Sequence, residues 1–105
     1  MNATTTRKFE GTVDSASPEF QGLHAPATLT LIDHGDRYEC RLVFVVGVPI
    51  PLTVIATKNP QNKIEGSAKD PRGWDVAFTA WLDGDRVTGT FRQPHDHGTF
   101  ELREV

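Results

Sequence analysis

The chain has 105 residues, of which 37% are hydrophobic and 24% charged, and its formal net charge is −3 at pH 7. This length suits a single domain spanning 1–105. The absence of a basic run argues against nucleic acid as the main partner. The most apolar stretch, 42–56, is interrupted by Gly47, Pro49 and Pro51, so no membrane-crossing helix is expected.

The N-terminal sequence and the cysteine content indicate where the protein works. Residues 1–11 contain no apolar segment of the kind that a secretory signal peptide needs. Cys40 is the only cysteine, so an intramolecular disulfide is impossible. We therefore expect a cytoplasmic protein, in which residues 1–6 form a disordered tail.

The first half of the chain alternates apolar and polar residues with the two-residue period of strands, and it lacks the period of an amphipathic helix. Turn signals separate the runs, with His-Gly-Asp at 34–36 and Asn-Pro at 59–60. The longest connection is 15–26. The pattern predicts strands at 7–14, 27–33, 36–46 and 51–58.

The second half continues this alternation. Asp-Pro-Arg-Gly at 70–73 fits a type I turn, and Asp-Gly-Asp at 83–85 is typical of a tight hairpin. The pattern predicts further strands at 62–69, 74–82, 85–92 and 98–104. Eight strands in an antiparallel up-and-down meander close best into a barrel, because closure removes the sheet edges. We therefore predict an all-β, closed meander barrel.

A weak repeat places glycine between apolar residues on one strand face, in FEGTV (9–13), IEGSA (64–68), VTGTF (87–91) and GTFEL (98–102). Glycine inside a strand usually marks a bend or a close approach of two backbones. Its recurrence on one face indicates a sheet that curls.

Strand parity then assigns each side chain to a face. The expected inward set is Phe9, Val13, Leu29, Leu31, Tyr38, Cys40, Leu42, Phe44, Leu52, Val54, Ile64, Trp74, Val76, Phe78, Val87, Phe91, Phe100 and Leu102. The expected outward set is Lys8, Glu10, Arg37, Glu39, Arg41, Lys63, Glu65, Arg86, Arg92, Glu101 and Arg103.

A short meander barrel with strands such as RVTGTF (86–91) resembles the avidin and lipocalin architectures, which belong to the calycin type. The Gly-x-Trp signature of the lipocalins is missing, since Phe9-Glu10-Gly11-Thr12 stands near the start. The resemblance implies a barrel that holds a small ligand, without naming that ligand.

In a meander, loops alternate between the two barrel ends, so 15–26, 47–50, 70–73 and 93–97 share one end. Barrel mouths with long loops are common ligand sites. We expect a small, partly apolar ligand to enter there. Its expected contacts are the walls Phe44, Trp74 and Phe91 and the polar side chains of His24, Arg72, His95 and His97.

The segment 89–101 has a second interpretation. Gly89, then His95-x-His97 and, four residues further on, Glu101, resembles the first half of the cupin metal motif. His95, His97 and Glu101 are therefore candidate ligands of a divalent metal. Parity argues against such a site, because it would expose Phe100 and Leu102 at roughly 1.5–3 kcal/mol for each large side chain. We therefore expect no cofactor.

Two further features bear on partners and chemistry. Cys40 has inward parity among apolar neighbours, which favours a core thiol over a nucleophile. Val43, Val45 and Ile55 fall on the outward face of neighbouring strands, and Ile32 and Trp81 are also outward. Neighbouring outward apolar residues are typical of an interaction surface, so we expect a homo-oligomer through this patch.

Three functional hypotheses follow from the sequence. The first is a barrel that binds a small molecule. The second is an enzyme in the same cavity, either a metal-dependent oxygenase or isomerase of the cupin kind or a metal-free catalyst with a rim histidine as general acid or base. The third is an interaction module with a filled interior.

Overall fold

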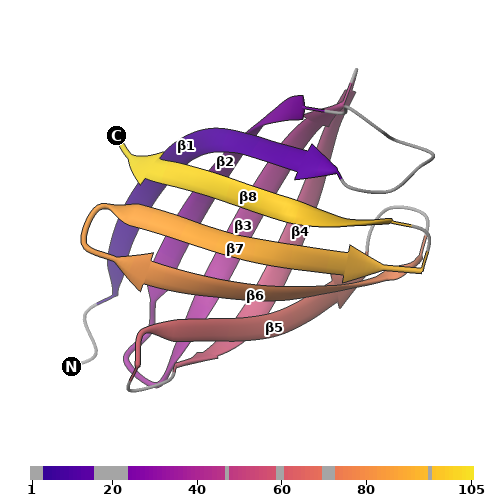
Figure 1. Ribbon diagram of the computed structural model, residues 1–105. Helices are drawn as coiled ribbons and strands as arrows, with labels where there is room; N and C mark the ends of the chain where they lie inside the picture. The colour runs from indigo at the N-terminus through magenta and orange to yellow at the C-terminus, as the bar shows by residue number, and fades with distance from the viewer. Residues whose placement is uncertain (1–3, 16–23, 47, 59–60, 70–72, 95) are drawn as a thin grey trace.

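The computed structural model describes residues 4–15, 24–46, 48–58, 61–69, 73–94 and 96–105. They form eight strands that pair in chain order, each antiparallel to the next, and β1 pairs with β8 to close a barrel (Figure 1). The strands are β1 (Thr5–Ser15), β2 (His24–Asp33), β3 (Arg37–Val46), β4 (Val48–Lys58), β5 (Lys63–Lys69), β6 (Asp75–Asp83), β7 (Arg86–Gln93) and β8 (Asp96–Glu104). The prediction of a closed, antiparallel meander barrel is confirmed.

The barrel interior holds the apolar side of every strand. The core contains most of the expected inward residues, together with Ala25, Ala27, Ala56 and Ala80. Tyr38 and Phe44 are half-buried and pack against it. On β8, Phe100 and Leu102 are 5% and 1% exposed, whereas Glu101 between them faces water. The register that separates charge from core is therefore the predicted one.

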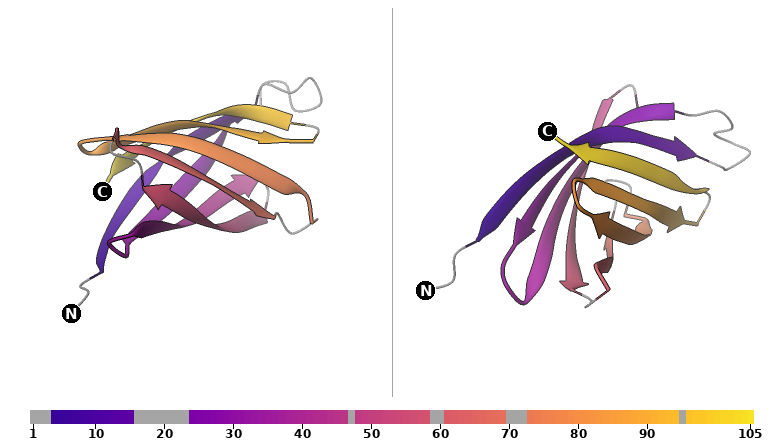
Figure 2. Two further views of the ribbon diagram at one scale, coloured as in Figure 1. Left: turned by 90° about the horizontal axis from the view of Figure 1, so that it is seen from below. Right: turned by 60° about the vertical axis from the view of Figure 1, so that its left-hand side comes forward.

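The closing pair of strands is tightly packed, and two glycines make this possible. A Cβ built on Gly11 of β1 would lie 1.9 Å from the carbonyl oxygen of Glu101, and one on Gly98 of β8 would lie 2.0 Å from that of Asp14. These distances are impossible for real side chains, so only glycine fits where β1 crosses β8. Figure 2 shows the two strands side by side.

Several predicted loops are shorter than expected. Strand β2 begins at His24, and β4 begins at Val48, which pairs with Val46 of β3. Strand β8 begins at Asp96, opposite Gln93. The loop bounds 15–26, 47–50 and 93–97 were therefore wrong, because short apolar-polar alternations next to Pro or His were taken for turns. Strand β1 also begins earlier, and Thr5 and Thr6 pair with β2 instead of belonging to the tail.

One pair of neighbouring strands is joined over only a short length. Within the described residues, β4 and β5 share the register pairs Thr57↔Glu65 and Lys58↔Ile64, both next to the turn that connects them. Every other neighbouring pair shares seven register pairs or more. Beyond this ladder no further register pair forms: Gly66 of β5 still lies against Ile55 and Ala56 of β4, and past this point the two strands run apart (Figure 1). We call this region the β4–β5 break.

Candidate functional site

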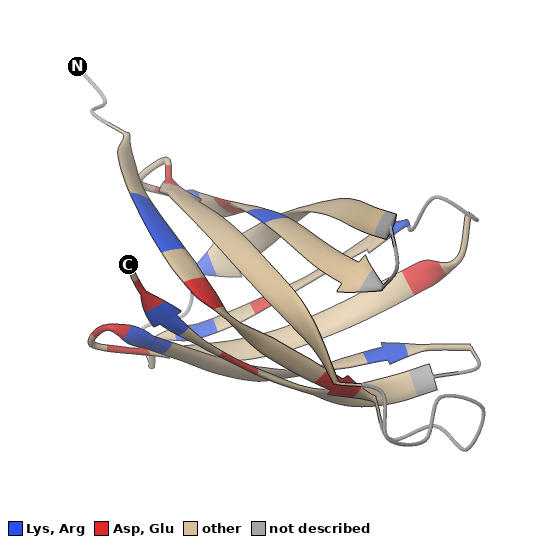
Figure 3. Cartoon of the chain, turned by 90° about the horizontal axis from the view of Figure 1, so that it is seen from above, with Lys and Arg blue, Asp and Glu red and all other residues tan. Residues whose placement is uncertain are grey.

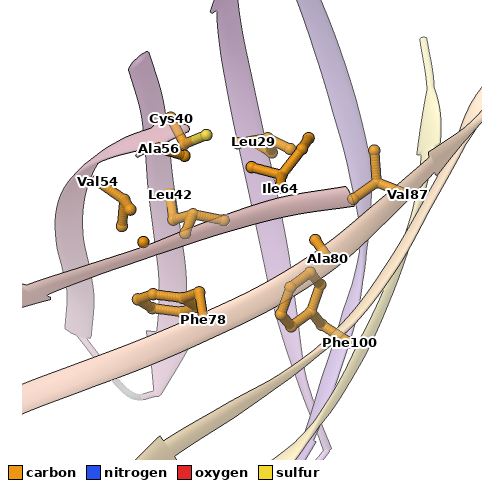
Figure 4. Close-up of a pocket in the computed structure, with 11 residues that line it drawn as sticks. Leu29, Cys40, Leu42, Val54, Ala56, Ile64, Phe78, Ala80, Val87 and Phe100 are labelled. Carbon is orange, nitrogen blue, oxygen red and sulfur yellow. The ribbon is translucent and has the colours of Figure 1, made fainter. Parts of the chain in front are cut away.

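A partly open cavity of about 30 Å³ lies on the inner side of the barrel. It is lined by Leu29, Cys40, Leu42, Val54, Ala56, Ile64, Gly66, Phe78, Ala80, Val87 and Phe100 (Figure 4). The lining side chains are hydrocarbon except for the Cys40 thiol. A site for one water needs about 10–15 Å³ and several polar partners, so this cavity has room for about two small groups and favours apolar ones.

An aromatic cluster, which shares Phe78 and Phe100 with the cavity lining, extends from the cavity toward the ends of β3 and β7. The ring centroids of Phe44 and Phe91 are 6.3 Å apart, and those of Phe44 and Phe78 are 6.4 Å apart. Phe78 also meets Phe100 edge-on at 6.4 Å. Such separations are typical of favourable aromatic pairs. The predicted wall residues Phe44 and Phe91 therefore contact each other, and neither lines the cavity.

The described members of the predicted polar set, His24 and His97, lie on strands. His24, the first residue of β2, is exposed and its Nδ1 contacts the Asp14 carboxylate of β1. His97 is exposed on β8 opposite Arg92, and Trp74 is half-buried directly before β6. Arg72 and His95 lie outside the described residues. The ligand-binding roles of these residues therefore stay predictions.

Two of the three candidate metal ligands, His97 and Glu101, lie within the described residues. His97 and Glu101 are both exposed on β8, and a Glu101 carboxylate oxygen lies 3.6 Å from Nε of Arg86. Because Phe100 and Leu102 fill the core, the motif is on the outer wall of the barrel at these positions. Among the described residues, no three side chains of His, Cys, Asp or Glu are grouped as metal ligands would be.

Cys40 is a buried core thiol, as expected from parity. Its side chain is 6% exposed between the register partners Leu31 and Val54. Burial in this apolar setting raises the pKa of the thiol to about 12, and the Glu39 charge acts in the same direction. The thiolate is the nucleophilic form, so Cys40 is poorly suited to nucleophilic catalysis at neutral pH.

The outer apolar patch divides into two parts. Val43 and Val45 of β3 face Pro51 and Pro49 of β4, and Val45 is 40% exposed. Ile55 is 55% exposed but lies further along β4 than Pro51, opposite Glu39 of β3. Residues 42–57 contain no charged side chain, and in Figure 3 the described residues of this range are tan.

The β4–β5 break is the feature that the sequence analysis missed. Two of its signals were visible: prolines at 49 and 51, which central strands rarely contain, and a glycine at 66. The four cavity residues Val54, Ala56, Ile64 and Gly66 come from the two strands that border the break. The cavity therefore borders both strands of this weakly paired part of the wall, as well as β2, β3, β6, β7 and β8.

Comparison with known proteins gives no family. The sequence matches no protein-family model, and no curated protein is similar to it at a significant level. The fold itself, a closed barrel of eight antiparallel strands, is consistent with the calycin-type architecture. No helix in the described part of the chain is long and apolar enough to span a membrane.

Proposed function

We propose that this barrel binds the hydrocarbon part of a small molecule in its interior. The observation that carries the proposal is the cavity behind β4 and β5, whose lining residues are apolar apart from one thiol. Burying an apolar group there is favourable by about 25 cal/mol for each Å² of surface removed from water. A polar group would lose its hydrogen bonds to water and find no partner on the lining side chains.

The cavity also limits the ligand. With room for about two small groups, it accepts a longer chain only if the wall moves outward. Cys40 is the one titratable group on its lining, and burial holds that thiol in the neutral form. Binding therefore fits the interior better than acid–base catalysis does.

Binding is tested with 1-octanol as the probe. Thermal unfolding and the methyl NMR signals of Leu42, Val54 and Val87 are measured as octanol is added. We expect the melting temperature to rise and these methyl signals to shift, because a ligand that binds only the native state stabilises it. Unchanged signals and melting temperature in the unmodified protein would contradict the proposal.

A matched pair of variants locates the site. Ala80→Leu fills the cavity from β6, whereas Ala77→Leu adds the same atoms to an exposed position of the same strand. Octanol should no longer affect Ala80→Leu, and it should affect Ala77→Leu as it affects the unmodified protein. Circular dichroism confirms that both variants fold. Equal responses of the two folded variants would place the binding site elsewhere.

We propose self-association through the outer face of β3 and β4 as a second function. The supporting observation is the uncharged surface formed by Val43, Val45, Pro49 and Pro51, since removing uncharged surface from water has no charge-desolvation penalty. Analytical ultracentrifugation tests it. We expect an oligomer that Val45→Lys dissociates and that Thr90→Lys, on exposed β7, leaves intact. A monomeric unmodified protein would exclude this function.

A further inference from the structure

We propose that the β4–β5 break is the entrance through which an unbranched aliphatic chain reaches the cavity, leaving its polar end at the outer rim. This inference rests on the proposed binding function and adds the route and the shape of the ligand. It moves the expected entrance from the mouth of the barrel to the side wall between β4 and β5, next to the start of β4.

The first argument is that the aromatic cluster stands on the path from the ends of β3 and β7 to the cavity. Phe44 lies two residues from the end of β3 and Phe91 two residues from the end of β7, and their rings meet at 6.3 Å. The cavity residues Leu42 and Val87 lie further from that end. A ligand entering there would have to displace packed rings, whereas at the break it would displace aliphatic side chains, chiefly that of Val54, which lies over Gly66.

The second argument is the direction of the backbone groups at the break. Alternate residues of a strand bond to opposite neighbours. Proline has no N–H to donate to a neighbouring strand. Since β4 stays paired with β3 along Pro49 and Pro51, its even residues bond to β3. The backbone groups of its odd residues therefore point toward β5. The carbonyl oxygen of Ile55 agrees, since it would lie 3.1 Å from a Cβ on Gly66 of β5.

The backbone groups of β4 that point toward β5 form no ladder with it beyond Thr57↔Glu65. If the register continued, Ile55 would stand opposite Ser67, and Thr53 opposite Lys69, but neither pair forms. Segments with few backbone hydrogen bonds open locally at low cost. Widening the break therefore disrupts no β4–β5 ladder pair beyond the two at the turn.

The two ends of the break differ in how firmly they are held. Near the turn, Nζ of Lys58 lies 2.9 Å from a carboxylate oxygen of Asp33 and 4.8 Å from the centre of the Tyr38 ring. These contacts tie the end of β4 to β2 and β3. At the other end, β5 is tied to β6 by the exposed pair Lys69–Asp75 at 3.1 Å, which places no restraint on β4. Opening is thus expected away from the turn.

The chemistry of the break selects the ligand. Its inner side is formed by Val54, Ala56 and Ile64, which suit hydrocarbon. Its outer rim carries the hydroxyl groups of Thr53 and Ser67, which are exposed to water. A slit between two strands admits an extended chain more readily than a ring of the same carbon number. A chain with a small polar end group matches both sides.

The route is tested with Cys40 as a built-in reporter, because it is the only cysteine and it lines the cavity. Methyl methanethiosulfonate transfers its methylthio group to the thiolate. A new sulfur–sulfur bond forms, the sulfur–sulfonyl bond breaks, methanesulfinate leaves, and the thiol proton goes to solvent. Mass spectrometry follows the adduct with time. The rate reports access to the cavity without any ligand present.

Two disulfides, each oxidised before labelling, separate the break from the rest of the wall. Ile55→Cys with Ser67→Cys joins the strands across the break. Thr90→Cys with Thr99→Cys joins two exposed residues that are register partners on β7 and β8. We expect the first disulfide to slow Cys40 labelling by at least about tenfold relative to the second, because it blocks local opening of the break. Equal rates in the two variants would overturn the entrance.

The shape of the ligand is tested by comparing 1-octanol with cyclooctanol in the same titration. We expect the straight chain to stabilise the protein at lower concentration than the ring. Equal or tighter binding of the ring would overturn the aliphatic-chain inference. If octanol binds and the labelling rates are equal, the entrance is wrong and the proposed function stands. If octanol does not bind, the proposed function and the ligand class both fail, whatever the labelling rates.

Discussion

Arg7 and Glu104 close the barrel with a two-point ion pair between residues 97 positions apart. Nε of Arg7 lies 2.8 Å from one carboxylate oxygen of Glu104, and Nη2 lies 2.8 Å from the other. The same Nη2 donates to the carbonyl of Gly84, in the turn between β6 and β7, at 2.7 Å. One guanidinium thus joins the first strand, the last strand and a neighbouring turn. Two-point pairs of this kind are geometrically specific.

Glu104→Gln should therefore lower thermal stability in a pH-dependent way. The hydrogen bond from Arg7 lowers the pKa of the Glu104 carboxyl in the folded protein. Its contribution is then present above the unfolded value of about 4.3 and is lost as pH falls through the folded pKa. The difference in melting temperature between the two proteins should be largest at neutral pH and should shrink in acid. Glu10→Gln, an exposed carboxylate on β1, is the control and should show little difference.

Three of the four close-packed glycines, Gly11, Gly66 and Gly98, should differ in their tolerance of alanine. Gly11→Ala and Gly98→Ala place a methyl group against backbone carbonyls across β1 and β8, and we expect each to cost more than about 3 kcal/mol. Gly66→Ala should cost less, because its closest contact is the end of a side chain, Cγ1 of Val54, and the nearest backbone atoms lie at 3.1 and 3.3 Å. Urea unfolding measures all three. An equal loss at Gly66 would show that the break is held as firmly as the closing pair of strands.

The fold was accessible from the sequence because its signals are local. Alternation of apolar and charged residues fixes which side chains face inward, and tight turns at 34–36 and 83–85 leave antiparallel neighbours as the simplest pairing. The prediction that Phe100 and Leu102 face the core while Glu101 faces water was also correct. Side chains alternate along a strand, so the two apolar residues can be buried only if Glu101 points outward. Strand ends were less predictable, because Pro49 was taken as the mark of a loop.

The site was less accessible because it depends on packing across the barrel. No local signal shows that the Phe44 ring meets the Phe91 ring, which comes from a strand 47 residues later. The loss of pairing between β4 and β5 is likewise a property of how two strands diverge in space. Pro51 indicated only that one edge of β4 lacks a donor, without saying which neighbour that edge faces.

Removing the aromatic cluster should open a second route to the cavity. Phe91→Ala should cost about 3–5 kcal/mol, because a buried ring is replaced by a void. The void lies beside Phe44 and Phe78, between the cavity and the end of the barrel. Methylthio labelling of Cys40 should become faster, even in the variant with the disulfide across the break. If labelling stays slow in that combined variant while it remains folded, the rings do not close this end.

Titration of the Cys40 thiol should lower the free energy of unfolding at alkaline pH. Burial raises the folded pKa of the thiol to about 12, whereas an unfolded thiol titrates near about 8.5. Its contribution is complete below the unfolded pKa and is lost as pH rises toward the folded one. The free energy of unfolding of Cys40→Ala, from urea curves between neutral and alkaline pH, should therefore fall less steeply than that of the unmodified protein. Parallel slopes would mean that the thiol is solvated in the native state.

Amide hydrogen exchange along β4, followed by NMR, tests the central claim most directly. If the barrel wall is open between β4 and β5, protection must alternate along this strand. The amides of Leu52 and Val54, which face β3, should exchange slowly, and those of Thr53 and Ile55, which face the break, at least about 100-fold faster. Thr57, inside the short ladder, should be protected again. Uniform slow exchange from 52 to 57 would show a continuous wall and contradict the account.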